Sequence, residues 1–265
     1  MRLNKAIKYI ILLALLNGLT GSHLLNAQKV KTKEDKNPIP DNFLAFGAQY
    51  GIQFPAGDLS DRFGSNFAAT FSLDYYNQKL KGYFGLETQI QFGDNVKEDV
   101  LAPFRLSSGA ILGTNGSIGQ IFLRRRGFYL GAFINKTLVS GRKNPASGLT
   151  YGLGVGILEH SVRIQDDQEN VGQVAGDLSK GYDRLTRGPA VKQAITYQHL
   201  GKNRNVNYSI GLTGFAAFTD SVRSINFDTG LSAKGSRVDL LISIDAKWYI
   251  PLLKSGSRTK EEVFY

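Results

Sequence analysis

Apolar and polar residues alternate strictly along segment 237–251, RVDLLISIDAKWYIP. Its even positions, from Val238 to Ile250, are all apolar, whereas its odd positions are mostly polar and carry charges of both signs. A period of two places successive side chains on opposite faces of a β-strand. One apolar and one charged face are typical of a strand with lipid on one side and a polar lumen on the other.

The same alternation recurs in seven earlier segments. The predicted strands cover 43–54, 67–76, 83–92, 127–138, 149–164, 189–200 and 206–218. Each has roughly the ten residues that a tilted strand needs to cross the hydrocarbon layer. Together with 237–251, they predict an all-β fold, an eight-stranded antiparallel up-and-down transmembrane β-barrel over residues 43–251.

The connections between these strands alternate in length. Segments 55–64, 93–126, 165–188 and 219–236 are long, whereas 77–82, 139–148 and 201–205 are short. Outer-membrane barrels have short periplasmic turns and long extracellular loops, so we expect both ends of the barrel segment in the periplasm. Residues 117–124 either extend the fourth strand or belong to the loop. The alternation slips after Ile157, which indicates a bulge near Leu158 or an extension beyond the membrane.

The segments outside the barrel have their own patterns. Residues 1–27 combine a basic start, a short apolar run and a small residue, Ala27, which predicts a secretory signal peptide, with a retained amphipathic anchor as the alternative. Residues 28–42 are charged and contain proline, as in a flexible periplasmic linker. Residues 252–265 form a basic periplasmic tail, in which we expect Phe264 and Tyr265 to contact a partner.

Composition narrows the function classes. The chain has 30 glycines, 11% aromatic residues and no cysteine, which fits a barrel and excludes disulfides and thiolate chemistry. Its formal net charge is +10, but the basic residues are dispersed, with no recognition helix beside them. We therefore expect contact with outer-membrane lipid and lipopolysaccharide rather than with nucleic acid. A soluble barrel of the lipocalin type, with its apolar face inward, is the structural alternative.

The polar faces of the strands carry charges of both signs. Side chains fill the lumen of an eight-stranded barrel, and opposite charges buried there must pair. We expect a lumenal network of Asp74, Glu87, Lys192, Arg237, Asp239, Asp245 and Lys247 that plugs the barrel, with a small-solute or ion channel as the alternative. Three glycines on one face of the fifth strand are expected to leave room for larger lumenal side chains from across the barrel: Gly152, Gly154 and Gly156.

The sequence predicts no catalytic, cofactor-binding or metal site. A lipid-active barrel enzyme needs a histidine and a serine on one strand face, but His160 and Ser161 are adjacent and so point to opposite faces. We expect His160 at the base of a loop or at an interface. The acidic clusters match no calcium-binding loop and are expected to be solvated turn residues. They comprise Asp58, Asp61, Asp166, Asp167 and Glu169.

One loop segment, 180–188, mixes aromatic and cationic side chains in a region that we expect to be exposed. Such a combination is common where proteins dock one another. Its candidate partner contacts are Tyr182, Arg184 and Arg187.

Several short motifs carry a family resemblance. They are the leader end at residues 26–28, the connection GDLSDRFG at 57–64, the loop GYDRLT at 181–186 and FDT at 227–229. With these, the chain resembles the small outer-membrane β-barrels common in Bacteroidota, a Gram-negative group. Some of those barrels accompany larger assembly or secretion machines, so the resemblance implies a non-enzymatic, structural or accessory role in the cell outer membrane.

The last strand also resembles the β-signal read by the barrel-assembly machinery. Ser243, Trp248 and Ile250 fit its pattern, whereas Asp245 stands where glycine is usual. The tail after Pro251 departs from the pattern too, which suggests that it has a periplasmic partner of its own.

Overall fold

The computed structural model describes residues 42–141, 146–201 and 207–252. The predicted signal peptide, all but the last residue of the linker and all but the first residue of the tail lie outside this range, as do Phe264 and Tyr265.

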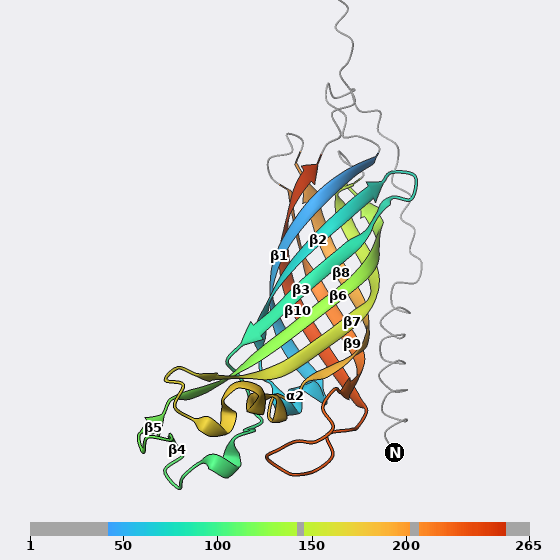
Figure 1. The fold of residues 1–265 in the computed structure, drawn as a ribbon. Coiled ribbons are helices and arrows are strands. Elements are labelled where there is room, and N and C mark those ends of the chain that lie inside the picture. Colours follow the sequence, from blue (N-terminus) through green and yellow to red (C-terminus); the bar gives the residue numbers. More distant parts are fainter. Residues whose placement is uncertain (1–41, 142–145, 202–206, 253–265) are drawn as a thin grey trace, which may run out of the picture. The chain divides into compact units, whose positions relative to one another are not determined.

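Eight long strands form one closed barrel (Figure 1). All neighbours are antiparallel, and β1 pairs with β10 to close the ring. The prediction of an eight-stranded antiparallel barrel is confirmed. Its strands are β1 (Asn42–Gly57), β2 (Asn66–Asn77), β3 (Gly82–Gly93), β6 (Ile121–Ser140), β7 (Gly148–Asp166), β8 (Thr186–Leu200), β9 (Asn207–Ser221) and β10 (Arg237–Leu252).

The remaining elements are short and lie in the long connections, which gather at one end of the barrel in Figure 1. We call this the loop end and the opposite end the turn end. No helix in the described part of the chain is long and apolar enough to cross a membrane. The loop elements are α2 (Leu59–Arg62), η1 (Ala102–Phe104), β4 (Ile111–Leu112), β5 (Ile118–Gly119), η2 (Gly172–Val174) and η3 (Gly176–Gly181).

Apolar side chains cover the outside of the barrel. On β10, Ile244 and Trp248 are 53% and 51% exposed, whereas Asp245 and Lys247 are only 5% and 9% exposed. A soluble barrel would have the opposite arrangement, since water would surround it. A closed barrel with an apolar exterior and a polar interior is the architecture of outer-membrane proteins. The protein is therefore located in the outer membrane, and the lipocalin alternative is wrong.

The strands β6 and β7 extend beyond the others at the loop end, where the fourth strand begins at Ile121 rather than at residue 127. On β7, residues 158, 160 and 162 remain buried and face inward, so the alternation continues and, of the two predicted alternatives, the bulge near Leu158 is wrong. The β6–β7 register instead shifts between Thr137 and Val139. The sequence pattern reverses after Ile157 because the outer face of β7 there meets water and its inner face meets the loops.

The barrel interior holds an apolar cluster at each end. At the loop end, inward barrel residues pack against loop residues such as Leu59, Leu101 and Tyr182 in one cluster. At the turn end, a second cluster is rich in aromatic rings, among them Tyr83 and Tyr249. Polar side chains fill the interior between the two clusters.

Glycines on β7 make space for side chains of the adjacent strands β6 and β8, so the prediction that they make room for side chains from across the barrel is wrong. A Cβ atom at Gly156 would approach the Tyr129 ring to 2.7 Å, and one at Gly152 would approach the Asn135 amide to 2.0 Å.

Candidate functional site

Two ion pairs cross the middle of the lumen. Nζ of Lys192 lies 2.6 Å from Oε1 of Glu87, and Nζ of Lys247 lies 2.6 Å from Oδ2 of Asp74. Both ammonium groups also lie within about 6 Å of the Phe133 ring centroid, at 6.0 and 5.5 Å, where a cation is attracted by the ring. These four charged groups therefore form two ion pairs inside the barrel, while Oδ1 of Asp74 has no hydrogen-bond partner among the described residues.

A small cavity of about 30 Å³ lies beside these pairs and is lined in part by Asp245. Such a volume holds one or two water molecules. Ser243 donates a hydrogen bond of 2.5 Å to Oδ1 of Asp245, whereas Oδ2 has no hydrogen-bond partner within the described ranges. We call Asp74, Glu87, Lys192, Asp245 and Lys247 the lumenal charge layer.

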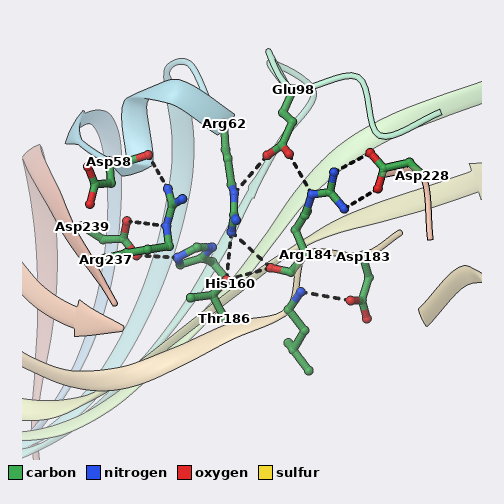
Figure 2. Close-up of polar contacts among 11 residues, drawn as sticks. Asp58, Arg62, Glu98, His160, Asp183, Arg184, Thr186, Asp228, Arg237 and Asp239 are labelled. Carbon is green, nitrogen blue, oxygen red and sulfur yellow. Dashed lines mark hydrogen bonds and ion pairs between the residues drawn. The ribbon is translucent and has the colours of Figure 1, made fainter. Parts of the chain in front are cut away.

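The other two predicted network members, Arg237 and Asp239, lie near the loop end instead. Oδ2 of Asp239 lies 2.8 Å from Nε2 of His160 and accepts a 2.5 Å hydrogen bond from Thr219. Arg237 lies 3.5 Å from Asp239 and also donates to the backbone carbonyl of Asp58 (Figure 2). The prediction of one network is therefore wrong, because the inward charges divide into a middle group and a loop-end group.

His160 is completely buried and faces inward, while Ser161 lies on the outward face of β7. The two side chains therefore do not meet, as their adjacent positions predicted. The absence of enzyme activity stays a prediction.

Neutral amides hold a buried arginine near the loop end, where the guanidinium carbon of Arg125 lies 5.0 Å from the centroid of the Phe63 ring. Arg125 is completely buried and donates hydrogen bonds of 2.6 Å to Asn66 and 2.6 Å to Gln91. Gln53 and Gln89 extend the same hydrogen-bonded chain across the lumen. The guanidinium group is therefore held by neutral oxygens rather than by a carboxylate, and its Nε has no hydrogen-bond partner among the described residues.

Ion pairs join loops that are far apart in the sequence (Figure 2). Glu98 accepts from Arg62 at 3.0 Å and from Arg184 at 2.7 Å, while Arg184 also donates two hydrogen bonds to Asp228. Nη1 of Arg62 donates to Thr186 at the start of β8. These contacts connect four loops, and with the loop-end apolar cluster they form a folded cap. We call residues 58–65, 94–120, 167–185 and 222–236 the cap.

The cap ion pairs have shifted pKa values. Burial of the Arg184 guanidinium works to lower its pKa, but its hydrogen bonds to Asp228 and Glu98 outweigh burial and raise the pKa above its usual range. Burial likewise works to raise the pKa of Asp228, but Arg184 outweighs it and lowers that pKa below 3.8. Both partners are therefore held in their charged forms.

The candidate partner contacts lie in different environments. Tyr182 and Arg184 are buried in the cap, at 7% and 5% exposure, so the prediction that they are exposed is wrong. They are buried because Tyr182 packs between Phe104 and Phe227, and because Arg184 finds two carboxylates there. Arg187 is exposed on β8 and pairs with Glu159.

Two of the acidic turn residues accept hydrogen bonds from backbone amides. Oδ2 of Asp58 accepts from the amide of Val238, and Asp166 accepts from the amides of Gln168 and Val171. Within the described residues, no cluster of three or more histidine or acidic side chains has a geometry that could hold a metal ion.

The loop between β9 and β10 exposes apolar side chains outside the lipid-facing band. Phe227 and Leu231 are 54% and 68% exposed, and Val222 and Ile225 are also exposed. The loop is nevertheless ordered, since Asp228 binds Arg184 and the Phe227 amide donates to the carbonyl of Gly181.

Sequence reasoning missed Arg62, Glu98 and Asp228 as partners of Arg184. These residues come from separate loops that follow no regular period, and the only signal was the presence of opposite charges in each long connection.

No family model matches this chain, and no curated protein matches it. Among solved structures, neisserial surface protein A is 13% identical with a TM-score of 0.38, covering 77% of this chain and 96% of its own. Ail, the attachment invasion locus protein of Yersinia pestis, is 8% identical with a TM-score of 0.41, covering 79% and 99%. Outer membrane protein AlkL is 11% identical with a TM-score of 0.34, covering 86% and 99%. These likenesses are weak, and the fold rests on the strand pairing itself.

Proposed function

We infer that the protein is a non-enzymatic outer-membrane barrel with a structural or accessory role, and that its cap binds a protein partner. The observation that carries this inference is the ordered loop between β9 and β10, which presents exposed apolar side chains outside the lipid-facing band. Exposed apolar side chains gathered on an ordered surface mark sites where proteins bind one another.

The lumen supports the same inference. Two ion pairs cross it, and aromatic rings fill its turn end. A barrel whose lumen is filled in this way can bind other molecules only at its outer surface and at its ends. No observation favours the channel alternative.

Co-purification tests the proposed role. Tagged protein would be cross-linked in intact cells and recovered from detergent-solubilised envelopes. The expected result is a partner in stoichiometric amount that is lost from an Ile225→Ser/Leu231→Ser variant. A Leu106→Ser variant, which changes an exposed apolar side chain on another loop, is the matched control and should retain the partner.

Two results would overturn the proposal. One is recovery of the barrel alone from its native envelope. The other is a partner that the Ile225→Ser/Leu231→Ser variant retains at the wild-type level, because the exposed loop would then play no part in binding.

A further inference from the structure

Three arginines lie together on the outward face of the strand extensions at the loop end. Arg124 and Arg126 are on β6, and Arg163 on β7 lies directly opposite Arg124 in the register. They face outward because the alternate positions, such as Arg125 and Val162, are buried inside the barrel. We call Arg124, Arg126 and Arg163 the arginine cluster.

The arginine cluster has no acidic partner within the part of the chain that the structure describes. Like charges directly opposite each other on neighbouring strands destabilise a sheet. The Arg124–Arg163 pair therefore lowers the stability of the barrel, and no acidic side chain of the described residues pairs with it. The nitrogen Nε of Arg124 is buried without a hydrogen-bond partner among the described residues.

The nearby carboxylates are already engaged. Glu159, on the same outward face, accepts a 2.6 Å hydrogen bond from Arg187, and Asp220 lies opposite Arg187 on β9. At the end of β7, Asp166 accepts from backbone amides and Asp167 accepts from Gln165. The arginine cluster therefore keeps an excess of positive charge.

The lipid-facing band ends directly below the cluster. Leu130 on β6 is paired with Ile157 on β7, and both are more than half exposed. Phe128 forms the next row with Glu159, and Arg126 follows two residues further along β6. With a rise of roughly 3.3 Å per residue and a tilt of about 40°, the cluster lies roughly 5–10 Å above Phe128, at headgroup level.

A ligand for this surface must place a negative charge at the arginine cluster and apolar chains against the lipid-facing band below it. Guanidinium groups bind phosphate oxygens with paired hydrogen bonds. Long loops of outer-membrane barrels are extracellular, so the loop end faces the outer leaflet. The surface is continuous with the lipid-facing band, which favours an amphiphile over a soluble anion.

We propose that the arginine cluster binds the phosphate group of the phosphorylated glycolipid of the outer leaflet, while Phe128, Leu130 and Ile157 contact its acyl chains. This site lies on the side of the barrel and is independent of the protein partner proposed for the cap.

Native mass spectrometry of the purified barrel with added diphosphoryl lipid A tests the proposal. An Arg124→Gln/Arg163→Gln variant is compared with a Lys180→Gln/Lys234→Gln control, which removes the same charge from the cap. Each arginine near an anionic lipid surface contributes roughly fivefold in affinity, so the arginine variant should bind roughly 30-fold more weakly. The control should bind like the wild type, and dephosphorylated lipid A should bind the wild type as weakly as the arginine variant binds lipid A.

Three outcomes would overturn the proposal. They are unchanged affinity of the arginine variant, equal affinity for phosphatidylglycerol, and displacement of lipid A by an equal concentration of inorganic phosphate. Unchanged affinity would show that the arginine cluster is not the binding site. Equal affinity for phosphatidylglycerol would show that the site takes any anionic lipid, and displacement by inorganic phosphate would show that it takes the free anion. If the double variant does not reach the folded, heat-modifiable form, Arg163→Gln alone, at an exposed position, gives the same test with a roughly fivefold loss.

Discussion

Among single residues, Glu87 and Lys192 make the clearest case that the lumen is held by charge pairing. Their side chains are 4% and 10% exposed and lie 2.6 Å apart. Removal of one partner leaves the other charge buried and uncompensated, so Glu87→Gln should lower the free energy of unfolding by about 3–5 kcal/mol. Urea unfolding of the barrel in lipid vesicles measures this loss.

Two further variants make that measurement specific. Asp245→Asn changes an inward carboxylate that makes no ion pair within the described residues and should lower the free energy of unfolding by less than Glu87→Gln does. A Glu87→Gln/Lys192→Met variant removes both charges and should recover most of the loss. Equal destabilisation by Glu87→Gln and Asp245→Asn would contradict the proposed importance of the pair.

Asp228 makes the cap sensitive to acid. Arg184 outweighs burial and lowers the pKa of Asp228 below 3.8, so the stabilisation is complete above pH 3.8 and is lost as the pH falls through the lower, folded-state pKa. Amide hydrogen exchange in the cap should therefore accelerate below pH 3.8 relative to exchange in the barrel strands, after correction for the intrinsic pH dependence. An Asp228→Asn variant should show fast exchange in the cap at neutral pH without this acid step. An acid step that persists in Asp228→Asn would assign it to another carboxylate.

For the strands, the sequence predicted the barrel well because the membrane imposes a strict period of two. The strand β10 alternates between lipid-facing and inward side chains along its length. The pattern failed on β7 beyond Ile157, where the outward residues Glu159, Ser161 and Arg163 are polar and lie above the lipid-facing band. Alternation of apolar and polar residues depends on what surrounds each face of a strand. Beyond Ile157 the strand continues, but the surroundings of both of its faces differ from those within the lipid-facing band.

The cap could not be predicted in the same way. Arg184 depends on Glu98 and Asp228, which lie 86 and 44 residues away in the sequence. Contacts between loops have no period, and charged loop residues look alike in sequence whether they are solvated or paired. The arginine cluster was recognisable only as the run at 124–126, and its joining with Arg163 required the β6–β7 register.

Close packing between β6 and β7 depends on Gly156. A Cβ atom there would lie 2.3 Å from the backbone oxygen of Leu130 and 2.7 Å from the Tyr129 ring. Because backbone atoms cannot move aside, Gly156→Ala should destabilise the barrel by about 1–3 kcal/mol. Gly214→Ala on β9 is the matched control, since a Cβ atom there has open space. The fraction of folded barrel, measured on heat-modifiability gels at increasing urea concentrations, gives the stability of both variants. Equal behaviour of the two variants would show that β6 and β7 tolerate a wider spacing.

As a whole molecule, the barrel is closed by side chains and by its cap. Aromatic rings fill the turn end, the lumenal charge layer crosses the middle, and the cap packs into the loop end. Both proposed binding sites lie on the outside of the barrel: the exposed apolar loop of the cap for a protein partner, and the arginine cluster for lipid phosphate.

Single-channel recording of the purified protein in planar bilayers tests most directly whether this barrel acts through its surfaces rather than through its lumen. The structure predicts no current steps above those of the bilayer alone for the wild type, because two buried ion pairs cross the lumen and an apolar, aromatic cluster fills its turn end. Reproducible unitary steps in the wild type, altered in size by Glu87→Gln or Lys247→Met, would contradict it and establish a conducting lumen.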